Sequence, residues 1–329
     1  MKSIVRTGAL TGLLFASAAG ALELAQYPRL QSVVDELAAE GVDRARLEAV
    51  FADARFDPGI IKALNRPAER LPWHRYRKIF LTDSRTAGGV EFWGTHQALL
   101  EQAQAQYGVP PRIVTAILGV ETRYGEVLGR HRVIDSLSTI GGSDHRRNDF
   151  FRSELREFLL LAHEEGHDPL EVRGSYAGAV GMPQFISSSY RAYAVDMDSD
   201  GRRDLWGSHA DVIGSVANYF KRHGWVAGKP VARPIEGVAT ATLERLAEAG
   251  YKPVHSIAAL KQAGLPPALF EGLEPGDKAA VVKLDQEQSA DYLLVFQNFY
   301  AITRYNHSPL YATAVWKLAD AIAARRGEP

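Results

Sequence analysis

Apolar residues recur three or four positions apart along most of the chain, the spacing that places them on one face of an α-helix. Two short helices are predicted between residues 30 and 51, and a long helix from Trp73 through Ala103 with an interruption at Gly88-Gly89. Further helices are predicted at 113–124, from Asp135, and at 150–163, 213–220, 292–300 and 311–324. The pattern indicates a mainly α fold.

A different pattern runs from Val226 to Asp291. Proline and glycine are frequent there, the helical patches at 241–249 and 256–264 are short, and Ala279–Leu284 has the composition of a β-strand. We interpret this segment as a small inserted α+β domain, after which the chain returns to its helical body.

The first residues are typical of a secretory signal. Residues 1–6 carry two positive charges, residues 9–22 are apolar, and small residues stand at 19–21. We expect cleavage after residue 21, and an uncleaved amphipathic first helix is the alternative. Because the chain has no cysteine, we expect neither a disulfide nor a lipid anchor. No later run approaches the roughly 18 apolar residues that span a bilayer, so the exported protein is expected to be soluble.

The charge of the chain is almost balanced. Its 329 residues include 38 basic and 39 acidic side chains. This balance offers no general attraction to nucleic acid or to an anionic membrane. An uncharged glycan or a small neutral molecule is the better candidate ligand.

Glu121 ends an otherwise apolar run that begins at Ile113. A carboxyl group near a low-dielectric interior holds its proton more strongly, so it can donate that proton to a leaving oxygen near neutral pH. A general acid in glycoside cleavage has this requirement. The alternative is a helix-end acid that pairs with Arg123 or Arg130.

A second catalytic carboxylate is not evident. Lysozyme-type hydrolysis uses two carboxylates roughly 5 to 9.5 Å apart. The nearest candidate is Asp135, which precedes an apolar-periodic segment, and we interpret it as a helix N-cap rather than a catalytic partner. With one carboxylate, Glu121 would protonate the bridging oxygen and then take the proton of the sugar's own 6-hydroxyl, which proximity favours over water.

Asp196, Asp198 and Asp200 alternate along the chain and are followed by Gly201, as in the first half of an EF-hand loop. Hard oxygen ligands at this spacing suit Ca²⁺, with Na⁺ as the alternative ion. Arg202 would contribute its backbone carbonyl. Position 12 of the loop lacks the usual glutamate, so Asp211 is expected to close the site. An acidic turn without an ion is the other interpretation.

Four segments carry a family likeness: Val120–Gly125, Gly174–Gly181 with Gln184-Phe185, Gly214–Phe220 and Ile302–Ser308. In this order they resemble the lytic murein transglycosylase B family, family 103 of the glycoside hydrolases, over nearly all of the mature chain. The resemblance implies a periplasmic enzyme with a lysozyme-like α-helical catalytic domain. It also implies cleavage of the MurNAc-GlcNAc β-1,4 bond of peptidoglycan with formation of 1,6-anhydro-MurNAc.

The resemblance also assigns roles to single residues. Glu121 would be the only catalytic acid/base, Ser175 would hold a substrate oxygen or an acetamido group, and Tyr76 would lie near the cleft. A basic pair, Arg146 and Arg147, would meet carboxylates of the substrate. The glycan groove would be lined by Gln184, Tyr219, Tyr305, Asn306 and Tyr311. Met182-Pro183 departs from the pair that many relatives carry, which affects the expected shape of the groove.

The expected organisation follows from the pattern and the resemblance together. It comprises a signal peptide at 1–21, an N-terminal helical region at 22–105, a lysozyme-like core at 106–225 with the ion loop at 196–211, the inserted domain at 226–291, and C-terminal helices at 292–329. Two other functions stay open: a hydrolytic muramidase of the same fold, and a non-catalytic calcium-binding protein that binds peptidoglycan.

Overall fold

The computed structural model describes residues 20–65 and 71–328. The predicted signal peptide lies outside these residues except for Gly20–Ala21, which form the short strand β1. Within the described parts the secondary structure is mainly helical, so the predicted fold class is confirmed. None of the helices in these parts combines the length and the apolar composition needed to cross a bilayer.

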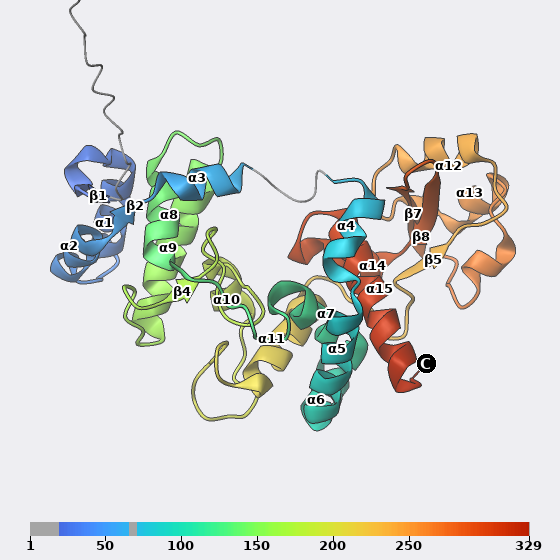
Figure 1. Cartoon of the computed structure of the whole chain (residues 1–329), viewed down its shortest axis with the longest axis horizontal. Helices are drawn as coiled ribbons and strands as arrows, with labels where there is room; N and C mark the ends of the chain where they lie inside the picture. The colour runs from blue at the N-terminus through green and yellow to red at the C-terminus, as the bar shows by residue number, and fades with distance from the viewer. Residues whose placement is uncertain (1–19, 66–70, 329) are drawn as a thin grey trace, which may run out of the picture.

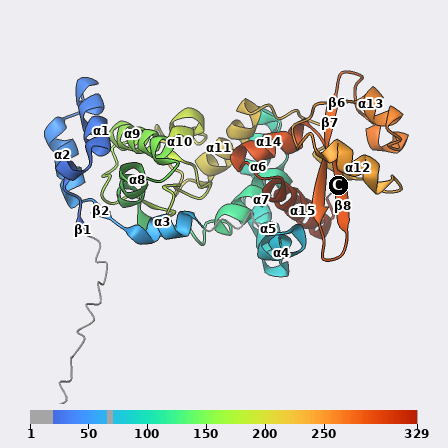
Figure 2. The ribbon, with the colours of Figure 1, turned by 90° about the horizontal axis from the view of Figure 1, so that it is seen from above.

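The molecule is elongated, and one of its ends consists of helices from two separate stretches of the chain (Figures 1 and 2). α9 packs against α1, α8 and α10, and α8 also contacts α3. The elements at this end are β1, the 3₁₀ turn η1 (Leu24–Gln26), α1 (Pro28–Ala39), α2 (Arg44–Asp53), β2 (Arg55–Phe56), α3 (Pro58–Leu64), β3 (His131–Arg132), α8 (Val133–Gly142), α9 (Asn148–Glu164), β4 (Arg173–Gly174) and α10 (Ser187–Tyr193). We call this end the first lobe.

A second helical group packs around α15, the last helix of the chain. α15 contacts α4, α5, α7 and α14, and α6 packs against both α7 and α11. Its members are α4 (Trp73–Phe80), α5 (Asp83–Thr95), α6 (Gln97–Tyr107), α7 (Pro111–Thr122), α11 (His209–Arg222), α14 (Gln297–Tyr305) and α15 (Pro309–Arg326). In Figure 1, α11 lies on the side of this group that faces the first lobe. The chain therefore passes between the two groups more than once, after α7 and again before α11.

A small four-stranded antiparallel sheet lies at the far end of the second group (Figure 1). Its strand order is β5-β8-β7-β6, and Val281 of β7 pairs with Leu294 of β8. The elements are β5 (Ala232–Pro234), α12 (Thr240–Ala247), β6 (His255–Ser256), α13 (Ile257–Gln262), η3 (Pro267–Phe270), β7 (Lys278–Asp285) and β8 (Ala290–Val295). These elements have a hydrophobic cluster of their own, which supports our proposal of an inserted α+β domain.

Two predicted helices differ from the structure. The helix expected from Tyr292 begins only at Gln297, because residues 290–295 form β8 and complete the sheet. The long helix expected from Trp73 to Ala103 is three helices, and its breaks fall after Phe80 and at His96 instead of at the glycine pair.

The glycine pair stays helical because packing requires it. A Cβ atom on Gly88 would lie 2.9 Å from the Tyr124 ring, and one on Gly89 would lie 2.7 Å from the Tyr124 hydroxyl. Gly119 of α7 receives the same ring from the other side. The three glycines therefore allow α5 and α7 to approach each other closely around Tyr124.

We expect Gly119→Ala to destabilise the protein by about 1–3 kcal/mol, although alanine is the better helix former. The new Cβ would lie 2.6 Å from Tyr124 Cζ, and the ring cannot move away because Gly88 and Gly89 lie behind it. Urea unfolding would measure the change. Gly94→Ala is the control, because the nearest atom to its Cβ is 3.6 Å away. Equal stability of the two variants would contradict the packing argument.

Candidate active site and ion loop

Glu121 lies in the last turn of α7, where the buried helix meets the surface. Most residues from Ile113 to Val120 are fully buried, whereas Glu121 itself is half-buried. The next residue, Thr122, is buried and donates a hydrogen bond from its hydroxyl to the carbonyl of Met182 at 2.9 Å. This hydrogen bond attaches the end of α7 to the segment Gly174–Phe185, which carries part of the family likeness.

A tight turn ends the helix directly after Glu121. Arg123 and Tyr124 have φ angles of 51° and 63°, a left-handed conformation that is uncommon for non-glycine residues. The Tyr124 hydroxyl donates a hydrogen bond to the carbonyl of Arg85 at 2.7 Å, which holds the turn in place. Such strain persists only where the surroundings enforce it, so the position of Glu121 is tightly determined.

Tyr311 is the contact that orients the Glu121 carboxylate. Its hydroxyl donates a hydrogen bond to Glu121 Oε1 at 2.5 Å. Ser308 caps α15 by accepting the Tyr311 N–H, which places the tyrosine in the first turn of that helix. Burial, and then the nearby Glu121 charge, raise the pKa of Tyr311 well above its ordinary value. Tyr311 therefore stays protonated and acts as a donor.

Two more of the predicted tyrosines lie behind this contact. Tyr305 is stacked on Tyr311 with 6.5 Å between ring centres, and its hydroxyl donates to the carbonyl of Pro183 at 2.5 Å. Burial, followed by the Glu121 charge, raises the pKa of Tyr305 as well. Tyr219 packs against Tyr305 and donates to the carbonyl of Arg304 at 2.6 Å. The structure thus brings these three tyrosines together beside Glu121.

Tyr76 is almost completely buried, as Tyr311 is. Only 1% of it is exposed, and its ring packs on Trp73 and Phe80 in α4. The Tyr76 phenol is close enough to Tyr311 to contribute to raising the pKa of that residue. Tyr76 therefore lies inside the fold in the neighbourhood of Tyr311 and not on the surface.

Ser175 and Gln184 stand on the loop between β4 and α10. The Ser175 Oγ accepts hydrogen bonds from the N–H groups of Ala177 at 3.2 Å and Ala179 at 3.0 Å, so its own O–H remains available as a donor. Gln184 has a left-handed φ of 51° and donates to the carbonyls of Gly181 and Leu128. Both side chains are half-buried.

The predicted basic pair belongs to the first lobe. Arg146 and Arg147 are exposed, and the Arg147 guanidinium lies over the Phe150 ring at 4.8 Å. Burial first, then the charges of Arg304 and Arg147, lower the pKa of His307. Arg147 is therefore close to the turn between α14 and α15, where Asn306 is half-buried. Phe150, which is 39% exposed, was not identified from the sequence because it lies within an amphipathic helix pattern.

Asp135 does not have the predicted role. It lies in the first turn of α8, whose N-cap position is occupied by Arg132. Its carboxylate accepts the N–H of Arg55 at 2.8 Å and forms an ion pair with Arg132 at 3.2 Å. Asp135 therefore connects β2 to α8, and the N-cap prediction was wrong because the helix already begins two residues earlier, at Val133.

The acidic loop brings three carboxylates together. Oxygen atoms of Asp196, Asp198 and Asp211 lie within 4.8 Å of one another. Asp211 is fully buried and accepts the N–H groups of Met197 and Asp204, both at 2.8 Å. The Asp200 carboxylate lies outside this group and accepts the N–H of Arg202. Sequence reasoning missed Ser208, whose hydroxyl donates to Asp198 at 2.7 Å.

This donor set fits a hard cation. Three carboxylates this close repel one another, and burial raises the pKa of Asp211 because its charged form is desolvated. Oxygen ligands alone, without nitrogen or sulfur, are what Ca²⁺ takes. The other predicted ligand, the backbone carbonyl of Arg202, lies on the same loop.

A mainly α fold in which one carboxylate packs beside several buried tyrosines is typical of the lysozyme-like class of glycan-cleaving enzymes. Residues 25–320 match the family model described as transglycosylase SLT domain. The chain is 40% identical over 315 residues to membrane-bound lytic murein transglycosylase B of Escherichia coli (strain K12), which covers 92% of this chain and 85% of that protein. The chain therefore belongs to the lytic transglycosylase family.

Solved structures agree with this assignment. The calcium complex of the Escherichia coli lytic transglycosylase Slt35 is 39% identical with a TM-score of 0.82, and covers 96% of this chain and 99% of its own. SltB3 from Pseudomonas aeruginosa in complex with NAG-NAM-pentapeptide is 31% identical with a TM-score of 0.78, and covers 92% and 79%. The lysozyme-like fold predicted from the sequence is confirmed.

We expect Tyr311→Phe to lower the turnover rate roughly ten- to hundredfold, because a hydrogen bond to a charged group contributes about 1.5–3 kcal/mol. The measurement is kcat on peptidoglycan. Tyr305→Phe is the control, since its hydroxyl donates to a backbone carbonyl and not to Glu121. A larger loss in Tyr305→Phe than in Tyr311→Phe would be inconsistent with this role of Tyr311.

Proposed function

We propose that this protein cleaves the MurNAc-GlcNAc β-1,4 bond of peptidoglycan and leaves 1,6-anhydro-MurNAc ends, with Glu121 as its single acid/base. The observation that carries the proposal is the orientation of the half-buried Glu121 carboxylate by Tyr311. The nearest candidate for a second catalytic carboxylate is Asp135, which accepts the backbone N–H of Arg55 and forms an ion pair with Arg132. The curated Escherichia coli relative is itself named a lytic murein transglycosylase.

The reaction needs two proton transfers at one carboxyl group. In the first, the Glu121 carboxylic acid gives its proton to the bridging oxygen while the bond from that oxygen to C1 of MurNAc breaks. In the second, the Glu121 carboxylate takes the proton of the MurNAc 6-hydroxyl as that oxygen bonds to C1. No water is consumed, and Glu121 ends protonated as it began. Because Tyr311 donates to Oε1, we assign the transferred proton to Oε2.

The remaining predicted residues would hold the substrate. The Ser175 hydroxyl, already accepting two backbone N–H groups, is oriented to donate to a sugar oxygen or an acetamido carbonyl. Arg146 and Arg147 are exposed and suited to carboxylates of the peptide stem. The glycan groove would be lined by Gln184, Tyr219, Tyr305, Asn306 and Tyr311. Buried Tyr76 would support Tyr311 instead of touching the sugar.

We further infer export to the periplasm by a cleaved signal peptide, without a lipid anchor. The chain contains no cysteine that could carry a lipid. In this respect we expect it to differ from the curated Escherichia coli relative, which is named as membrane-bound.

We also infer that the acidic loop binds Ca²⁺, with Na⁺ as the alternative, through Asp196, Asp198 and Asp211 and the carbonyl of Arg202. Support comes from the clustered oxygens and from the calcium complex of Slt35. The ion would neutralise the three carboxylates and hold the loop against the start of α11.

Replacing Glu121 by Gln removes the transferable proton but keeps the shape of the side chain. We expect Glu121→Gln to lose sacculus clearing by a factor of about 10² or more, with an unchanged melting temperature. Mass spectrometry of wild-type products should show the anhydro form, lighter by one water than the reducing end that a muramidase leaves. Full activity of the variant would refute the assignment of Glu121, and reducing-end products would establish the hydrolytic alternative.

Removing calcium with a chelator should lower the melting temperature, because an ion bound only to the native state adds about 2.7 kcal/mol at one hundred times its dissociation constant. Differential scanning calorimetry across a calcium titration measures this. Asp198→Asn should lose most of the response, and Asp200→Asn should lose less because its carboxylate lies outside the cluster. A melting temperature independent of both calcium and sodium would contradict ion binding.

A further inference from the structure

A pocket lies outside the catalytic centre, next to the loop between β4 and α10 that carries Gln184. Its volume is about 400 Å³, within the range of small-molecule sites. The lining residues that matter here are Leu128, His167, Glu171, Val172, Arg173 and Trp206. They come from the segment after α7, the connection from α9 to β4, and the end of the acidic loop.

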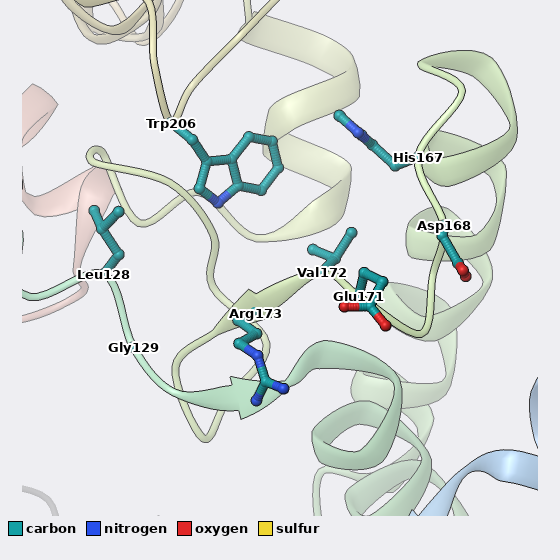
Figure 3. A pocket seen from close by; sticks show the side chains of 8 residues that line it. All are labelled: Leu128, Gly129, His167, Asp168, Glu171, Val172, Arg173 and Trp206. Atoms are coloured by element: carbon teal, nitrogen blue, oxygen red, sulfur yellow. The ribbon is translucent and has the colours of Figure 1, made fainter.

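The pocket has an aromatic wall and a charged rim. The His167 ring meets the Trp206 indole edge-on, with 5.3 Å between ring centres. Figure 3 shows these two rings on one side, Glu171 and Arg173 on the other, and Val172 between them. An aromatic face next to a few polar groups matches a sugar ring, whose C–H face is apolar and whose edge carries hydroxyls.

The wall is held in place before any ligand arrives. The backbone N–H of Trp206 donates to the Asp204 carboxylate at 2.8 Å, and the carbonyl of Leu205 accepts the N–H of Met182 at 2.8 Å. The Trp206 ring also packs on Tyr190, with 5.9 Å between ring centres. Binding would therefore need little ordering of this side chain, which favours affinity.

The pocket and the catalytic centre share one wall. Gln184 donates to the carbonyl of Leu128, whose side chain lines the pocket, and Met182 accepts the Thr122 hydroxyl beside Glu121. A polymer that occupies the catalytic centre can therefore extend across this wall. An acidic peptide stem is the less suitable occupant, because Glu171 and Asp168 at the rim would repel its carboxylates.

We propose that the Trp206 pocket binds an N-acetylated sugar residue of the glycan strand, away from the bond that is cleaved. The indole stacks on the sugar ring, Leu128 and Val172 receive the acetamido methyl group, and Glu171 and Arg173 bind hydroxyl and carbonyl groups at its edge. This inference rests on the proposed function, and its consequence is a preference for long strands over short fragments.

The test compares turnover of intact sacculi with turnover of a soluble tetrasaccharide fragment. In Trp206→Ala and in Glu171→Ala, the ratio of the two rates should fall about fivefold, the loss expected from about 1 kcal/mol for one aromatic contact or for one hydrogen bond. Tyr251→Ala is the matched control, because it removes a half-buried ring that touches one other ring, Tyr300, in a distant part of the molecule. Its ratio should equal that of the wild type.

A binding measurement separates the pocket from catalysis and from misfolding. In the Glu121→Gln background, cosedimentation with sacculi should weaken about fivefold when either Trp206→Ala or Glu171→Ala is added. Because Glu171 is exposed, its variant tests the pocket even if Trp206→Ala unfolds. Unchanged rate ratios and unchanged cosedimentation in Glu171→Ala would overturn the proposal. Failure of the wild type to cleave either substrate would overturn the proposed function instead.

Discussion

The hydrogen bond from Tyr311 to Glu121 is the interaction on which the site depends, because it joins the last helix of the chain to the helix that carries the acid. Tyr311 can reach Glu121 only if α15 packs along α7, and that packing is the centre of the second helical group. The C-terminal residues therefore complete a site that begins some 190 positions earlier in the chain. Tyr311 and Tyr305 are buried and stay protonated, so the carboxylate faces neutral phenols and not competing charges.

A second constraint is the route of the chain between its two helical groups. The segment after Glu121 leaves α7 through a left-handed turn, and the segment from Ser175 to Gln184 returns toward it. The Thr122 hydroxyl connects these two segments by its hydrogen bond to the carbonyl of Met182. Hydrogen bonds through Thr122, Met182 and Leu205 connect the end of α7 to the Gly174–Phe185 segment and to the acidic loop. A cation in the acidic loop would therefore stabilise the same junction that holds Trp206.

Much of this architecture could be predicted from the sequence, and the failures have physical causes. Helical periodicity identified the mainly α fold, and the strand composition of Ala279–Leu284 identified β7. Gly88 and Gly89 were misleading because the Tyr124 ring, distant in sequence, needs the space that they leave. A helix was predicted from Tyr292 because its apolar neighbours suit either a helix or a strand. Hydrogen bonding to β7 stabilises the strand instead. The Tyr311 contact and the Trp206 pocket depend on tertiary packing, so periodicity alone does not reveal them.

In the proposed reaction one carboxyl group performs both proton transfers, and the sugar's 6-hydroxyl takes the place of water. The most direct test is digestion of sacculi in water enriched in heavy oxygen, followed by mass spectrometry of the released muropeptides. We expect anhydro products without heavy oxygen at C1 of MurNAc. Incorporation of heavy oxygen at that carbon during cleavage would show that water is the nucleophile and would contradict the proposed mechanism.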